Sequence, residues 1–387
     1  EMPITHHFAY ASARYAVTRS EWHPSTGSGH GVAIEVYHHP GHDGNVGRMI
    51  DAARKSLAYF AASFCPYPHR HLRIVEFPRY VRDATSFPGM ISFSESMGFN
   101  ARLDGEEMID YPFYVTAHEV AHQWWGQQLV GANVQGVGML HETLAQYSAL
   151  RVMEDEVGRR GMRRVLAHER DAYLRGRAGE RGVEPPLALV ERQEYVYYHK
   201  GALAMHALRD AVGEVPLDRA LSLYFLRAAS GEPPYATTAE LLEEIRLAVP
   251  EGSERLVEDL FERVTMFDTE VTAATSTACV DGRFLVRLEL EARKLQTDGA
   301  GAEREIRIDD WIDIAVFGEE GEGEDDGVPL FFERRRIRAS PAAFEIVVDQ
   351  PPARVAVDPY SKLIDRDDGD NVRAVQSAGA RASRCPP

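Results

Sequence analysis

The chain is poor in cysteine and lysine, and long apolar runs are missing from its 387 residues. Three cysteines, Cys65, Cys279 and Cys385, are too few for a disulfide framework and form no C-x-x-C pair, so we expect isolated thiols. The cysteine count therefore does not distinguish a reducing from an oxidising compartment. No run of 18 apolar residues occurs, so the sequence predicts no membrane-spanning helix. A charged-then-apolar leader is also missing behind Glu1, and we expect a soluble fragment of a longer protein.

Positive charge is in short supply as well. The chain carries 43 basic and 60 acidic residues, which gives a formal net charge of −17. A chain this acidic repels phosphate backbones, so a nucleic acid is not an expected partner. Hydrophobic residues make up 44% and charged residues 27%, which is typical of globular proteins. The length favours two or three domains.

Hydrophobic periodicity divides the chain into parts. Short apolar runs at Phe8–Val17 and Val32–Tyr37 predict strands, and helical spacing follows over Asp43–Phe64. Further strands are predicted at Leu72–Phe77 and Met90–Phe99, and nearly continuous helix over 110–264. A period of two then returns at Phe284–Glu291, Trp311–Phe317, Pro329–Phe332 and Phe344–Val348. We expect remnant strands of an N-terminal β domain over 1–40, a second domain over 41–266, a β-sandwich over 267–366 and a flexible tail over 367–387.

The most informative segment contains two histidines four residues apart. His118 and His122 share one face of a helix at this spacing, so both imidazoles can reach one metal ion. Glu119 stands beside them in an H-E-x-x-H arrangement, where its carboxylate serves as a base for water. Asp110 is expected to cap this helix, and Pro112 suits its first turn.

A catalytic zinc ion requires a third protein ligand and one open position. Glu142 begins another predicted helix after a glycine-rich turn, and its neighbour His141 is a rival ligand. Adjacent helix positions point about 100° apart, so only one of the two can aim at the metal. The flanking apolar pattern favours Glu142. Gln146, one turn further, is a candidate partner for Glu142.

Three segments together resemble the gluzincin aminopeptidases, the family of aminopeptidase N and leukotriene hydrolase. They are His118-Glu-Val-Ala-His-Gln-Trp-Trp-Gly126, Met139-Leu-His-Glu-Thr-Leu-Ala-Gln-Tyr147 and Tyr198-His-Lys-Gly201. The resemblance covers about residues 1–265. Within the family, the sequence looks most like the peptidase part of bacterial proteins that fuse this domain to an ABC-type permease. The segments that carry this more specific resemblance are Ala132-Asn-Val-Gln-Gly136 and the run that starts at Glu142.

The resemblance implies an α+β multidomain fold. A thermolysin-like catalytic domain, mostly helical after a small mixed sheet, would precede a β-sandwich. It also implies one zinc ion held by His118, His122 and Glu142, with Glu119 as general base. Tyr198 would donate a hydrogen bond to the oxyanion. The implied reaction removes N-terminal residues from peptides.

The sequence departs from the family pattern at two places. Nineteen residues separate His122 from Glu142, where the family usually has eighteen, and we interpret the extra residue as a loop insertion. The motif G-x-M-E-N is also altered. Its best counterpart is Ser94-Glu-Ser-Met-Gly98 on an expected edge strand, in which Glu95 would bind the free α-amine of the substrate.

Two other functions remain open from the sequence. The altered amine motif and the thermolysin-like spacing fit a zinc endopeptidase. A docking or sensor domain of a fused transporter is the non-enzymatic alternative, although a structural zinc site requires no base such as Glu119. The resemblance to permease fusions places the domain outside the inner membrane, attached through a part that precedes this chain.

Overall fold

The computed structural model describes residues 7–25, 30–103, 105, 108–229, 232–319, 329–379 and 385. The chain divides into two compact units. Unit 1 comprises residues 1–177 and 185–262, and unit 2 comprises 178–184 and 263–387. Among the described helices, none combines the length and apolar character that a membrane span requires. Both helices and strands are abundant, which confirms a mixed α and β fold.

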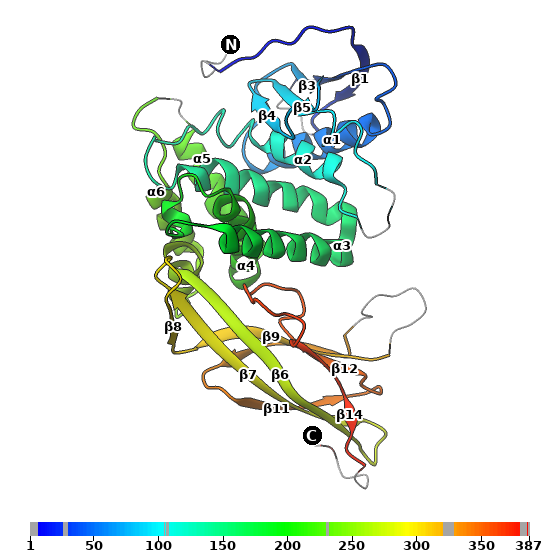
Figure 1. Cartoon of the computed structure of the whole chain (residues 1–387), viewed down its shortest axis with the longest axis vertical. Helices are drawn as coiled ribbons and strands as arrows, with labels where there is room; N and C mark the ends of the chain where they lie inside the picture. Colours follow the sequence, from blue (N-terminus) through cyan, green and yellow to red (C-terminus); the bar gives the residue numbers. More distant parts are fainter. Residues whose placement is uncertain are drawn as a thin grey trace. The chain divides into compact units, whose positions relative to one another are not determined.

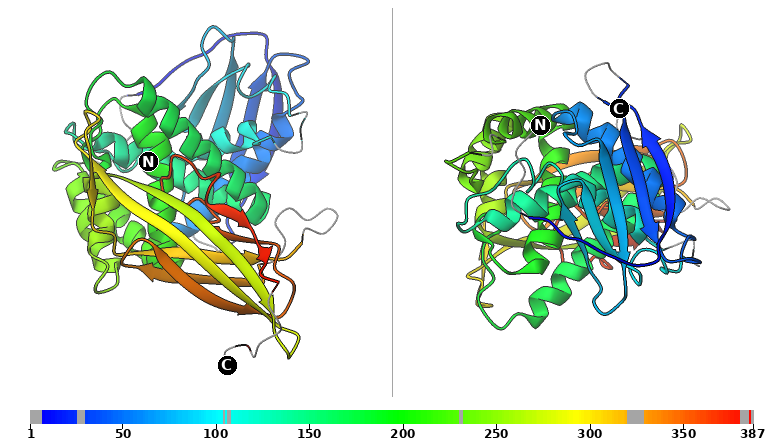
Figure 2. Two further views of the ribbon diagram at one scale, coloured as in Figure 1. Left: turned by 60° about the horizontal axis from the view of Figure 1, so that its bottom comes forward. Right: turned by 90° about the horizontal axis from the view of Figure 1, so that it is seen from above.

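Unit 1 begins with a five-stranded mixed sheet of order β1-β2-β3-β5-β4 (Figures 1 and 2). The central strands β2, β3 and β5 run parallel, while β1 and β4 are antiparallel edge strands. Branched apolar residues alternate along β2, so that Val32, Ile34 and Val36 are buried. The strands are β1 (Ala16–Trp22), β2 (Val32–His38), β3 (His71–Phe77), β4 (Ala84–Phe87) and β5 (Met90–Ser94).

Helices make up the rest of unit 1. Helix α1 (Val46–Ser63) packs against β1, β2 and α2, and its buried face repeats at Met49, Ala53, Leu57 and Phe60, as the sequence predicts. The helices that follow are α2 (Tyr111–Ala121), η1 (Met139–Thr143), α3 (Leu144–Gly179), η2 (Leu187–Leu189), η3 (Tyr195–Lys200), α4 (Gly201–Val212), α5 (Glu214–Ala228), α6 (Thr238–Ala248), α7 (Arg255–Val257) and η4 (Glu258–Glu262).

Two short segments of this unit differ from the sequence prediction. The first strand occupies Ala16–Trp22 rather than Phe8–Val17, and β5 ends at Ser94 rather than Phe99. The edge strand is β4, which the sequence did not predict because four residues are too short to show a period. Glu95 therefore follows an inner strand and does not lie on the sheet edge.

Unit 2 contains two β-sheets that both contribute buried residues to one large hydrophobic cluster. One sheet has the order β10-β9-β12-β13, and the other has the order β11-β7-β6-β14 with β8 on β7 (Figures 1 and 2). Buried Val286, Leu288 and Leu290 of β7 meet Ile312 and Ile314 of β9 in this core. The strands are β6 (Val264–Ala278), β7 (Phe284–Thr297), β8 (Glu303–Ile306), β9 (Asp310–Phe317), β10 (Phe331–Ile337), β11 (Ala342–Val348), β12 (Arg354–Val357), β13 (Val372–Ala374) and β14 (Gln376–Ser377).

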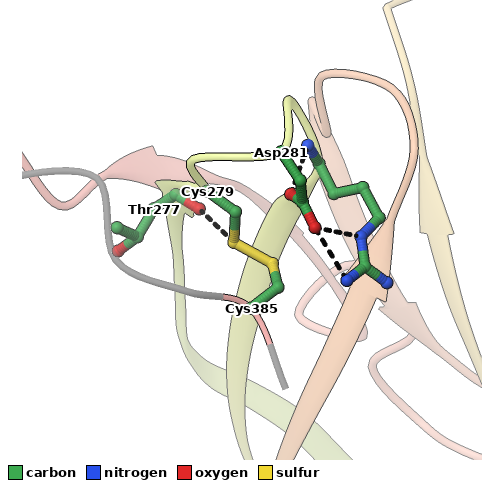
Figure 3. The surroundings of a disulfide bond; sticks show 5 residues. Thr277, Cys279, Asp281 and Cys385 are labelled. Carbon is green, nitrogen blue, oxygen red and sulfur yellow. Dashed lines mark hydrogen bonds and ion pairs between the residues drawn. A yellow bond between two sulfur atoms is a disulfide. The ribbon is translucent and has the colours of Figure 1, made fainter. Parts of the chain in front are cut away.

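The C-terminal segment differs from the flexible tail expected over 367–387. Val372–Ala374 pairs with β12, and Gln376–Ser377 pairs with β6. Cys385 forms a disulfide with Cys279, across a sequence separation of 106 residues (Figure 3). The prediction of isolated thiols is therefore wrong for these two cysteines and holds for Cys65. Strand β13 lacked a sequence signal because its three residues are exposed, so no apolar alternation marks them.

Candidate active site

Helix α2 and its C-cap residue His122 include three of the predicted site residues. The Asp110 side chain accepts a hydrogen bond from the Phe113 N–H at 3.1 Å, and proline occupies the first turn, so both predicted start signals are confirmed. The helix holds His118 and His122 on one face, with ring centroids 4.7 Å apart. Carboxylate and imidazole ligand atoms of His118, Glu119 and His122 lie within 4.8 Å of one another.

Glu142 completes a triangle with the two histidines. Its Oε2 atom lies 3.4 Å from His118 Nε2 and 3.2 Å from His122 Nε2, while the two Nε2 atoms are 3.0 Å apart. The oxygen is buried and has no hydrogen-bond partner among the residues that the structure describes. Ligands about 2.0–2.1 Å from a tetrahedral zinc ion lie about 3.3 Å from one another. The three residues therefore fit a single zinc ion.

Electrostatics favour the same set. Burial alone would lower the pKa of His122, but the charge of Glu142 outweighs it and raises this pKa to about 9. Burial likewise opposes ionisation of Glu142, yet the two imidazoles hold its pKa well below the usual range. The charged carboxylate that a zinc ligand requires is therefore stable here.

His141, the rival ligand, points elsewhere. Its Nε2 atom accepts a hydrogen bond from the Gly131 N–H at 3.0 Å, and burial lowers its pKa to about 4. The structure thus brings Glu142, and not His141, to the histidine pair. Both residues lie in η1, a π-helical turn.

Glu119 is 5% exposed beside the triangle. Burial raises the pKa of its carboxyl group; the two imidazoles oppose this shift, while the charges of Glu142 and Asp83 add to it. A carboxylate with a raised pKa is a better proton acceptor for water than an exposed glutamate.

Tyr198 approaches the site from a second π-helical turn, η3, and its ring centroid is 5.6 Å from that of His118. Thr143 donates a hydrogen bond to the Tyr197 carbonyl at 2.5 Å, which ties η3 to η1. Gly201 ends the Tyr198-His-Lys-Gly201 motif, and a Cβ atom there would collide with the Thr143 side chain. The glycine is required because the two turns approach closely.

Glu169, in the middle of α3, is a polar residue of this region that the sequence analysis missed. It is 1% exposed and accepts hydrogen bonds from Tyr114, Gln146 and His199 at 2.9, 3.3 and 2.7 Å. Gln146 therefore pairs with Glu169, and not with Glu142 as the sequence suggested. No local pattern could have shown this, because the three partners lie 23 to 55 residues from Glu169 in the sequence.

Glu95 has different neighbours from the other predicted site residues. Its carboxylate oxygens lie 4.0 Å from His42 Nδ1 and 3.8 Å from Arg79 Nε. His42 in turn lies 2.5 Å from the fully buried Glu76. That short distance is typical of a hydrogen bond to a carboxylate, in contrast to the even spacing of the zinc triangle. The chain thus holds Glu95 beside the ends of the parallel strands β2 and β3.

Comparisons with known proteins point to one group of enzymes. Human endoplasmic reticulum aminopeptidase 2 is 25% identical over 204 residues, which are 50% of this chain and 21% of that protein. Probable aminopeptidase 1 of Sulfurisphaera tokodaii is 27% identical over 183 residues, 45% of this chain and 23% of that protein. Matches to these curated relatives thus span less than a quarter of their length.

A solved structure of Legionella pneumophila aminopeptidase A in complex with aspartic acid resembles this chain with a TM-score of 0.57. The match covers 95% of this chain and 39% of the other at 14% identity, which shows a shared fold. The family model described as the peptidase family M1 domain matches residues 48–261, more than half of the chain. This match contains the histidine pair, Glu142 and Tyr198, and the chain belongs to the M1 family of zinc metallopeptidases.

Proposed function

We propose that this protein is a zinc-dependent aminopeptidase that removes N-terminal residues from peptides. The triangle of His118, His122 and Glu142, with the buried Glu119 beside it, carries the proposal. Two imidazoles and one carboxylate are the ligands of catalytic zinc sites that keep a position open. Membership of the M1 family and its aminopeptidase relatives support the same activity.

Each residue has a chemical role in this proposal. When bound, the zinc ion supplies a Lewis acid that activates water and polarises the scissile carbonyl. Glu119 takes a proton from the attacking water and passes it to the departing amine. Tyr198, whose pKa is raised by burial and by Glu142, keeps its proton and donates a hydrogen bond to the oxyanion.

An acidic side chain near the start of β4 would bind the free α-amine. Glu95 is the sequence candidate, and its carboxylate is 18% exposed. Asp83 is a second candidate, because it is exposed directly before β4 and its charge acts on Glu119. The positive charge of Arg79 partly neutralises the Glu95 carboxylate, which would have to attract the positively charged α-amine. This favours Asp83 as the residue that binds the amine.

The alternative activity is that of a zinc endopeptidase. The enclosure of Glu95 by His42 and Arg79 favours it, since an enzyme without an amine anchor accepts a blocked N-terminus. A low-activity docking or sensor domain of a fused transporter is a third possibility, against which the buried Glu119 argues.

The domain assignment is part of the proposal. We infer a thermolysin-like catalytic domain over 41–266 and a β-sandwich over 267–366, supported by the shared fold with the Legionella enzyme. From the resemblance to permease fusions, we infer that the domain lies outside the inner membrane and is attached to an ABC-type permease. The Cys279–Cys385 disulfide supports this location, because such bonds persist in oxidising compartments.

A release assay on paired peptides tests the activity. One peptide has a free N-terminus, the other is N-acetylated, and the protein is loaded with zinc. Cleavage of the free-amine peptide alone supports the aminopeptidase. Cleavage of both establishes the endopeptidase, and cleavage of neither by zinc-bound protein supports the docking domain.

A further inference from the structure

Glu169 connects α2, α3 and η3, which carry or directly follow the proposed machinery. Its Oε1 atom accepts hydrogen bonds from Tyr114 of α2 and from Gln146 near the start of α3, and its Oε2 atom accepts one from His199 Nδ1 of η3. Helix α2 bears Glu119, the residues before Gln146 include Glu142, and η3 bears Tyr198. One buried carboxylate is thus bonded to the helix that bears Glu119, to the start of α3 directly after η1, and to the turn that bears Tyr198.

Of the three hydrogen bonds to Glu169, the one from His199 bears most directly on the position of Tyr198. His199 directly follows Tyr198, and its 2.7 Å contact has the length of a charge-assisted hydrogen bond. On the other side, Thr143 holds the carbonyl of Tyr197. The backbone of Tyr198 is therefore fixed at both neighbours, one bonded to Glu169 and the other to η1.

We propose that Glu169 and His199 form a positioning pair that holds the Tyr198 hydroxyl in place for the oxyanion. The inference rests on the proposed peptidase function and adds residues to it. Neither residue touches the substrate in this proposal. Oxyanion donors act only when held within about 0.5 Å of the productive position, so loss of the tether lowers the rate of the chemical step.

Two substitutions of His199 distinguish the effect of its hydrogen bond to Glu169 from the effect of its side-chain volume. In His199→Asn, the amide nitrogen stands near the place of Nδ1 and can still donate to Glu169. In His199→Leu, the volume is similar and the donor is lost. The side chain is 27% exposed, so neither change empties the core. We expect kcat to fall about tenfold in His199→Leu with KM and zinc content unchanged, and to recover most of the loss in His199→Asn.

A double-mutant cycle with Tyr198→Phe shows whether the pair acts through the hydroxyl. If the pair acts only by positioning the Tyr198 hydroxyl, it has no effect on the reaction once that hydroxyl is absent. His199→Leu should therefore cause no further loss of kcat in the Tyr198→Phe background. Independent, multiplicative losses would overturn the proposal, as would equal losses in the Asn and Leu variants.

A measurement without turnover separates this inference from the proposed function. Amide hydrogen exchange, followed by mass spectrometry, should be faster over residues 195–201 in His199→Leu than in the wild type and in His199→Asn. Unchanged exchange would refute the tether even in an active enzyme. If the wild-type protein binds zinc and cleaves no peptide, the proposed function fails, while the exchange result still decides whether the pair holds the turn.

Discussion

At the residue scale, the proposed role of Glu119 in catalysis can be tested separately from zinc binding. Glu119→Gln retains the shape of the side chain and removes the proton acceptor. Peptide cleavage should fall at least about a hundredfold, because general-base catalysis contributes at least that much. Zinc content, measured by atomic absorption, should stay at the wild-type level. In the matched variant His122→Ala, zinc and activity should be lost together; equal zinc loss in both variants would contradict the assignment.

The pKa of His122 predicts how zinc binding depends on pH. This imidazole is protonated below about pH 9 in the metal-free protein, and a zinc ligand must be neutral. Binding therefore releases a proton, and affinity should rise about tenfold per pH unit up to that value. Competition with a chelating dye between about pH 6 and about pH 8 measures the slope. A flat profile would show that Glu142 does not raise this pKa.

The two candidate amine anchors give opposite outcomes. If Asp83 binds the α-amine, Asp83→Asn should raise KM for free-amine peptides about tenfold or more, since a charged hydrogen bond is lost. Glu95→Gln should then change KM little, because its carboxylate is already paired with Arg79. Initial rates on free and acetylated peptides measure both. The reverse result would restore the sequence assignment of Glu95.

Local patterns explain which residues could be identified from sequence. His118, Glu119 and His122 lie within five positions of one helix, so their spacing alone predicts a common face. The choice between His141 and Glu142 depends on the orientation of η1, which the sequence does not give. Identifying Glu169 depends on knowing which distant segments of the chain pack together. Such contacts depend on tertiary packing, which leaves no periodic signal.

At the element scale, the two π-helical turns share one narrow contact. Gly201→Ala would push a methyl group into Thr143 and displace the turn that bears Tyr198. We expect unit 1 to lose about 1–3 kcal/mol of stability and kcat to fall, since overpacking shifts backbone. Denaturant unfolding and peptide assays measure both effects.

Two variants serve as controls for that change. In Gly179→Ala, the new Cβ meets open space, so stability should stay within about 0.5 kcal/mol. Thr143→Ala combined with Gly201→Ala removes Oγ1 and Cγ2, the two nearest of the three colliding atoms, and should restore part of the stability. A neutral Gly201→Ala single variant would refute the close approach.

Periodicity predicted α1 and β2, but it missed the 15-residue strand β6 as well as the short β4. Helix α1 and strand β2 have clear buried faces over seven residues or more, which is why their limits fall within three residues of the prediction. Strand β4 has four residues, and α3 changes direction at Gly158, whose φ of 63° interrupts the helix. Neither the short edge strand nor the break shows in a hydrophobic pattern.

At the scale of the whole molecule, the disulfide stabilises unit 2. Replacing both Cys279 and Cys385 by serine should lower the free energy of unfolding of this unit by about 2–5 kcal/mol, because the unfolded chain regains the freedom of a long loop. Denaturant unfolding monitored at Trp311 in β9 measures the loss. Cys65→Ser, in unit 1, should leave this transition unchanged.

The same bond makes a covalent ring of residues 279–385, which contains most of the β strands of unit 2. A protease that nicks the chain anywhere inside this ring produces two pieces that remain one molecule until a reductant is added. On a denaturing gel, the nicked protein would therefore migrate as a single species without reductant and as two fragments with it.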